Sequence, residues 1–251
     1  MCKSILLFSL FMLLLFQGPA VRGEDFSGKR GDHSIEFLAS DLFSEKQASE
    51  WGKYVPLDET ISWEVYVPES YDPSVPPGLF VYISPTPSGL IKTEWKQVLN
   101  DRNMIWIGAN KSGNPQKPIK RGAFAILGTE LIKTHYELDE ERIYLSGFSG
   151  GGRTASGLIQ NFSHLFKGAL YICGVNFWQK TPRALALIQQ NRFVFLTGSR
   201  DFNYRGTREV FREYRKANVP NIHFMSVKNM AHTLPSARYF NEAIAYLDKD
   251  I

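Results

Sequence analysis

The residues around Ser149 constrain the fold more than any other stretch of the sequence. Apolar residues 143–145 predict a short buried strand, and a helix is expected over residues 154–162. Between them, residues 147–151 read GFSGG and fit the pattern G-x-S-x-G. A strand that turns so tightly into a helix strains the backbone of the central residue and makes its side chain project beyond the sheet.

Ser149 is therefore a candidate nucleophile, with its hydroxyl near the positive end of the following helix. The alternative interpretation is a Gly-rich turn that binds phosphate. We favour the nucleophile because no lysine follows the glycines as it does in a Walker motif.

Apolar strands alternate with helical patterns along most of the 251 residues. Strands are predicted at 61–67, 79–83, 104–109, 168–175, 193–196 and 222–227, and helices at 91–100, 119–136, 182–190, 204–218 and 237–247. This alternation predicts an α/β fold with a mostly parallel central sheet and right-handed crossovers. We expect a single domain over residues 34–251, with no large cap domain.

The N-terminus has the layout of a secretory signal peptide. Lys3 precedes an apolar run over residues 5–16, and small residues follow at the end of the segment 1–23. The apolar run is short for a membrane span, so we expect cleavage, export and no stable span afterwards. An uncleaved anchor is the alternative. Residues 24–33 are polar and Gly-rich, which predicts a flexible segment.

Cysteine usage and charge exclude several classes of site. Cys2 belongs to the signal peptide, which leaves Cys173 alone in an apolar run and rules out an internal disulfide. We interpret Cys173 as a buried strand cysteine in preference to a nucleophile. No H-x-x-x-H pattern or carboxylate cluster with ligand spacing is present, so no metal site is predicted. The net charge of +4 is spread without a basic stripe, which argues against a nucleic-acid partner.

A nucleophilic serine needs a general base and a group that orients this base. In parallel sheets such groups gather at the carboxyl ends of strands. Of the five histidines, His232 lies just past the end of the strand predicted at 222–227, which favours the general base over a structural histidine. Asp201 follows the strand predicted at 193–196 and would orient the imidazole. The alternative role for Asp201 is a helix cap, which Asn203 could supply instead.

The oxyanion formed during acyl transfer needs N–H donors. We expect one from Gly150, directly after the nucleophile, and a second from residues 84–89, which read SPTPSG. Because proline lacks an N–H, Thr86 is the donor at the centre of this loop. Ser84 and Ser88 are alternatives, and a rigid turn without a catalytic role is a further one.

Aromatic side chains also fall at or just after predicted strand ends. They could line a substrate pocket or only pack around its rim. The aromatic residues concerned are Phe148, Phe177, Trp178, Phe202 and Tyr204.

These motifs resemble those of the α/β-hydrolase superfamily, and the chain is similar to secreted serine esterases of the polyhydroxybutyrate-depolymerase and feruloyl-esterase type. The likeness covers roughly residues 60–250. It rests on YVPESYD at 66–72, on LDEERIY at 138–144 with the GFSGG turn, and on the chain order Ser149, Asp201, His232. Many members of this family carry a His-Gly pair where Ser84-Pro85 stands in this sequence.

The resemblance implies an exported serine hydrolase that cleaves small-molecule or polymeric carboxylic esters through an acyl-enzyme and needs no cofactor. A serine peptidase on the same fold and a non-catalytic binding module are the alternatives. Such peptidases often carry an extra domain, and we expect none within these 251 residues, so the peptidase ranks below the esterase. Oligomeric state and natural substrate do not follow from these motifs.

Overall fold

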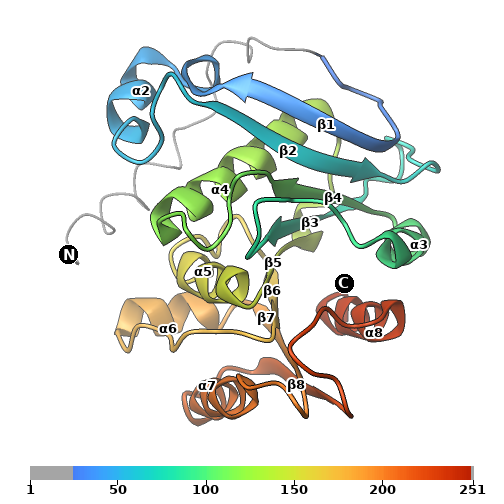
Figure 1. The fold of residues 1–251 in the computed structure, drawn as a ribbon, viewed down its shortest axis with the longest axis vertical. Helices are drawn as coiled ribbons and strands as arrows, with labels where there is room; N and C mark the ends of the chain where they lie inside the picture. Colours follow the sequence, from blue (N-terminus) through green and yellow to red (C-terminus); the bar gives the residue numbers. More distant parts are fainter. Residues whose placement is uncertain (1–24, 250–251) are drawn as a thin grey trace.

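A computed structural model describes residues 25–249, which form one eight-stranded sheet (Figure 1). The strands are β1 (Gly31–Leu38), β2 (Thr60–Val67), β3 (Gly78–Ile83), β4 (Met104–Ala109), β5 (Ile143–Phe148), β6 (Gly168–Ile172), β7 (Arg192–Gly198) and β8 (Asn221–Val227). Their order in the sheet is β1-β2-β4-β3-β5-β6-β7-β8. β2 runs antiparallel to both β1 and β4, and all other neighbours are parallel.

Helices cover both faces of the sheet (Figure 1). The α-helices are α2 (Glu45–Trp51), α3 (Lys96–Asp101), α4 (Pro118–His135), α5 (Gly150–Ile159), α6 (Pro182–Ile188), α7 (Tyr204–Lys216) and α8 (Ala237–Leu247). Short 3₁₀ turns occur at η2 (Ala39–Leu42), η3 (Thr93–Trp95) and η4 (Glu140–Arg142). α4, α5, α6 and α7 pack on one face, and α3 and α8 pack on the other. None of the helices within residues 25–249 has the length and apolar character that crossing a membrane requires.

The central strands are buried on both sides, which explains their continuous apolar runs. In β3, Leu79, Val81 and Ile83 join the core under α4 and α5, whereas Phe80 and Tyr82 join the core under α3 and α8. Successive side chains of a strand point to opposite faces, so one strand contributes to two cores. The predicted α/β class with a mostly parallel sheet is confirmed.

The N-terminal region differs from the sequence expectation. Residues 25–33 have defined contacts where a flexible segment was expected: Phe26 is 1% exposed, its ring stacks on His135 with centroids 3.8 Å apart, and β1 begins at Gly31. The aromatic contact and the antiparallel pairing with β2 order a stretch whose composition is polar. The predicted signal peptide, residues 1–23, lies outside the described residues.

The helix behind the Ser149 turn begins earlier than its sequence indicates. It was expected at 154–162, but α5 starts at Gly150 and ends at Ile159. The first turn of α5 consists largely of glycine, which has a low helix propensity, so the sequence pattern does not indicate a helix there. Because helix α5 starts at once after Ser149, its N-terminal end stands at the carboxyl edge of β5. The loops that follow β3, β7 and β8 reach the same edge.

Candidate active site

Ser149 occupies the sharp turn between β5 and α5. Its backbone has φ 54° and ψ −116°, a conformation that residues other than glycine rarely adopt. The sequence predicted this strain. Ser149 is also the N-cap residue of α5, but its side chain makes no capping hydrogen bond. The hydroxyl is therefore available for a partner outside the helix.

Two glycines make this turn possible. A Cβ atom on Gly151 would lie 1.8 Å from the carbonyl oxygen of Ile83, and one on Gly147 would lie 2.3 Å from the carbonyl carbon of Gly151. Neither separation is sterically possible. The absence of side chains at these positions lets the start of α5 press against the end of β3, which brings Ser84, the first residue of the following loop, against this turn.

The structure brings the three predicted side chains together in one hydrogen-bonded chain. His232 Nε2 lies 2.9 Å from Ser149 Oγ, and His232 Nδ1 lies 2.8 Å from Asp201 Oδ1. Because an ionised carboxylate only accepts, Nδ1 carries the proton that is donated to Asp201, and Nε2 is left to accept from the Ser149 hydroxyl. This is the tautomer that a general base requires.

Asp201 is held as a carboxylate. Its side chain is 0% exposed, and burial alone would raise its pKa. Hydrogen bonds from the Asn203 N–H (3.0 Å) and the Thr197 hydroxyl (2.7 Å), together with His232 and Cys173, outweigh burial and hold the pKa of Asp201 below its ordinary value. The anion therefore persists beside the imidazole, where it can stabilise an imidazolium.

The helix-cap alternative for Asp201 is only partly realised. Asp201 Oδ1 accepts the Asn203 N–H directly before α7, so the carboxylate organises this turn as well as the histidine. Asn203 is the N-cap residue but does not cap α7 with its side chain. Its amide instead donates to the Cys173 carbonyl (2.8 Å) and accepts from Arg153 (2.9 Å). Asn203 therefore ties the Asp201 loop to the end of β6.

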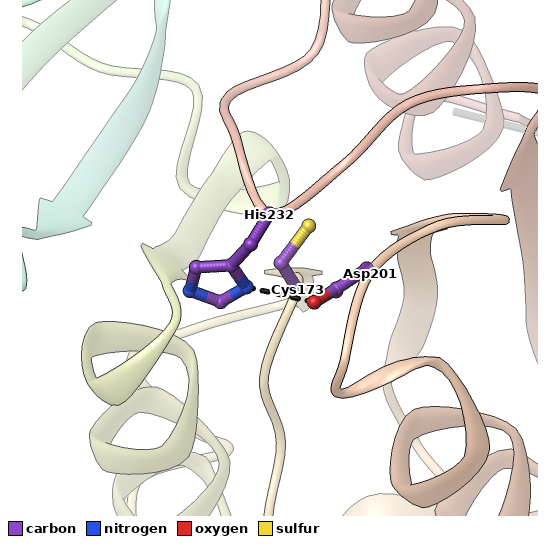
Figure 2. Close-up of side chains that lie close together, drawn as sticks. All are labelled: Cys173, Asp201 and His232. Atoms are coloured by element: carbon purple, nitrogen blue, oxygen red, sulfur yellow. Dashed lines mark hydrogen bonds and ion pairs between the residues drawn. The ribbon is translucent and has the colours of Figure 1, made fainter.

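Cys173 lies directly behind the Asp201–His232 pair (Figure 2). Its thiol, the imidazole and the carboxylate offer three potential metal-ligand atoms within 4.8 Å of one another, a cluster that sequence spacing did not indicate. Burial and the neighbouring Asp201 raise the pKa of the Cys173 thiol to about 12. A cysteine acts as a metal ligand or nucleophile in its thiolate form, whereas the raised pKa keeps the Cys173 thiol protonated. We therefore interpret this thiol as a hydrogen-bond donor that supports Asp201.

This protonation state predicts slow thiol chemistry. Native protein at pH 8 should react with iodoacetamide at Cys173 far more slowly than the same protein unfolded in guanidinium chloride, because the thiol is buried and its raised pKa leaves little thiolate. Intact mass spectrometry over time measures both rates. Rapid labelling of the folded protein at Cys173 would contradict the interpretation.

Of the two predicted oxyanion donors, Gly150 directly follows the nucleophile, and Thr86 lies in the loop after β3. Gly150 is the first residue of α5. The Thr86 N–H donates to the Ser84 hydroxyl at 3.1 Å, and the two side-chain oxygens lie 2.9 Å apart, so the loop is braced internally. Thr86 would have to exchange this partner for an oxyanion, and its role stays a prediction. The Asn114 amide packs on Gly150, since a Cβ there would lie 2.0 Å from Asn114 Oδ1.

Two of the five predicted pocket aromatics flank the imidazole. The rings of Phe148 and Phe202 lie 4.8 Å and 4.1 Å from the His232 ring between centroids, and Phe202 is 76% exposed. Tyr204 packs on Phe224 instead, and Trp178 packs against the core. Phe177 is exposed. Phe148 and Phe202 are thus the members of the set best placed to contact a substrate.

Sequence reasoning missed two residues that shape this site. Thr197, at the end of β7, donates to Asp201, and Arg121, near the start of α4, contacts the loops around Ser149. Arg121 carries a detectable signal: it stands three residues before Phe124, on the apolar stripe of its helix, where an arginine is unexpected. Thr197 carries none, because threonine is common in strands.

Comparison with known proteins supports the fold. No protein-family model and no curated protein matches the sequence. The structure is similar to the feruloyl esterase module of Clostridium thermocellum complexed with sinapinate, with a TM-score of 0.66, 12% identity and 93% of each chain covered. It is also similar to the fluorophosphonate-binding serine hydrolase F of Staphylococcus aureus, with a TM-score of 0.63, 14% identity, and 89% of this chain and 100% of that chain covered.

A larger protein shares the same architecture in part. The chain resembles a putative dipeptidyl aminopeptidase IV from Bacteroides ovatus, with a TM-score of 0.59, 14% identity and 93% of this chain covered, but only 37% of that chain. At such identities the likeness speaks for the fold alone. The sheet order, the flanking helices and these matches show that the chain has the α/β-hydrolase fold.

Proposed function

We propose that the protein is a serine hydrolase that cleaves carboxylic esters. The observation that carries this proposal is the continuous hydrogen-bond chain from the Ser149 hydroxyl through His232 to Asp201, set on the strained turn between β5 and α5. Acyl transfer requires a nucleophile bonded to a base, and that base bonded to a carboxylate. Side-chain packing alone would not account for these three groups bonded in this order.

The geometry is compatible with the following steps. Ser149 Oγ forms a bond to the ester carbonyl carbon while its proton passes to His232 Nε2, and the carbonyl π electrons move to oxygen. The oxyanion returns these electrons, the bond to the alcohol oxygen breaks, and His232 gives its proton to the leaving alcohol. Water then attacks the acyl-enzyme by the same route and releases the acid and Ser149.

Export and substrate class extend this proposal. Residues 1–23 have the composition of a secretory signal peptide, so we expect the enzyme to act outside the compartment of its synthesis. Aromatic rings beside His232 favour acyl or alkyl groups with apolar surface. The similarity to the feruloyl esterase module makes aromatic esters the first substrates to test.

Peptide bond cleavage is the second candidate, favoured by the resemblance to the putative dipeptidyl aminopeptidase IV. The same triad serves both reactions, but this chain spans little more than a third of that protein. The likeness therefore covers only the part of that protein that shares this fold, whereas the match to the feruloyl esterase module covers 93% of both chains. We therefore rank the ester reaction first.

A substrate panel separates the candidates. Purified protein lacking residues 1–23 should hydrolyse p-nitrophenyl acetate, p-nitrophenyl butyrate or methyl ferulate, and a fluorophosphonate probe should label Ser149, as located by peptide mass spectrometry. Peptide p-nitroanilides serve as the amide arm. Turnover of amides without turnover of esters would reverse the ranking, and a folded protein inert to every substrate and to the probe would favour a binding module.

A further inference from the structure

Arg121 lies beneath the loops that surround Ser149. It belongs to the first turn of α4, and it is 3% exposed. Its Nε donates to the Ser112 carbonyl at 2.8 Å, Nη1 to the Gly150 carbonyl at 3.2 Å, and Nη2 to the Ser84 carbonyl at 2.8 Å. A single planar guanidinium thus joins three segments: the loop after β4, the start of α5 and the loop after β3.

Two of these segments carry the predicted oxyanion donors. The Gly150 N–H is one predicted donor, and Ser84 begins the loop that contains the other, Thr86. The loop after β4 braces the loop after β3, since the Asn114 N–H donates to the Pro85 carbonyl at 2.9 Å. Fixing the three carbonyls on one rigid group therefore fixes the spacing between the Gly150 and Thr86 amides.

The guanidinium charge of Arg121 has no anionic partner within residues 25–249, where no carboxylate forms an ion pair with it. Burial lowers the pKa of Arg121, although Tyr82 nearby opposes this effect. Burial also raises the pKa of Tyr82, so its phenol is neutral and offers no counter-charge. The cation stands close to the N-terminal end of α5, which already carries positive charge.

Burying a cation without a charged partner costs free energy. Arg142, which we interpret as a structural arginine, has a different environment. Arg142, at the opposite end of β5, donates from Nε to Asp248 at 3.0 Å and so forms a charge pair. In the part of the chain that the structure describes, the hydrogen-bond partners of Arg121 are all backbone carbonyls. An arrangement that leaves a positive charge uncompensated beside a nucleophile favours the arrival of a negative charge.

We propose that Arg121 is a positioning residue of the oxyanion hole, which holds the Gly150 and Thr86 segments in register and supplies the counter-charge for the oxyanion that forms when Ser149 attacks. This inference rests on the proposed hydrolase function. The ester carbonyl is neutral before attack, and its oxygen is negative afterwards. Arg121 therefore stabilises the transition state more than the bound substrate, and its loss lowers kcat with little change in KM.

The test compares Arg121→Gln with the matched control Arg142→Gln, each checked for folding by thermal unfolding. On p-nitrophenyl butyrate we expect Arg121→Gln to lower kcat roughly 10²-fold, the scale of one lost oxyanion donor, with KM changed less than about two-fold. The inhibition constant of an alkyl trifluoromethyl ketone, which gives an anionic adduct with serine, should rise in the same proportion as kcat/KM falls. Arg142→Gln should lower the unfolding temperature without this kinetic pattern.

The outcomes separate the inference from the proposed function. A wild-type protein without ester turnover removes the proposed function, and the Arg121 inference with it. Wild-type turnover with a folded Arg121→Gln variant of unchanged kcat and unchanged ketone affinity overturns the Arg121 inference alone. If the glutamine variant does not fold, Arg121→Lys carries the test. It keeps the charge with fewer donors, so a smaller, matched loss of kcat and ketone affinity supports the inference, and wild-type values overturn it.

Discussion

Replacing Ser149 with alanine is expected to lower kcat for p-nitrophenyl esters by about 10⁶-fold, the loss typical of a triad nucleophile. The alanine variant keeps His232 and Asp201 but has no oxygen that can form the acyl-enzyme, and only the oxyanion donors and substrate binding remain to act. Steady-state ester hydrolysis measures this loss. Labelling by a fluorophosphonate should disappear with it.

The matched control for this prediction is Ser146→Ala on the same strand. Ser146 is buried and donates to the Leu170 carbonyl at 2.8 Å, so its removal tests the loss of a serine hydroxyl from β5. We expect about 1 kcal/mol lower stability and unchanged fluorophosphonate labelling. If Ser149→Ala were still labelled at the wild-type rate, another residue would be the nucleophile and the proposed mechanism would be wrong.

Local sequence patterns predicted the central sheet and the position of the candidate site. Fully apolar runs define β3 and β4, and Ser149, Asp201 and His232 each follow a strand. Parallel strands present their carboxyl ends at one edge, so residues distant in the sequence could be assigned to one place. The distances that join them come from the structure.

Features that depend on contacts between distant segments did not follow from the sequence. β1 has mixed polarity, GDHSIEFL, and is ordered by its pairing with β2 and by Phe26 stacked on His135. The first turn of α5 consists of glycines, whose role is steric and depends on the carbonyl of Ile83. The bridging role of Arg121 exists only once three separate loops have come together.

Asp201→Asn is expected to lower kcat by about 10⁴-fold while leaving the fold intact. The asparagine amide can donate to His232 Nδ1, which then favours the tautomer with the proton on Nε2, where it cannot accept the Ser149 proton. It also cannot stabilise the imidazolium. The folded-state pKa of Asp201 lies below its ordinary value of 3.8, so the wild-type carboxylate is ionised at neutral pH and the loss applies there in full.

Stability gives an independent readout of the same carboxylate. Because the pKa of Asp201 is depressed on folding, its contribution to the free energy of unfolding is fully present above pH 3.8 and is lost as the pH falls through the folded-state value. The stability difference between wild type and Asp201→Asn should therefore shrink in that acid range. Asp72→Asn, which changes a carboxylate bonded to Ser74 in the loop before β3, should leave kcat unchanged. Wild-type kcat in Asp201→Asn would show that His232 needs no carboxylate to act as the base.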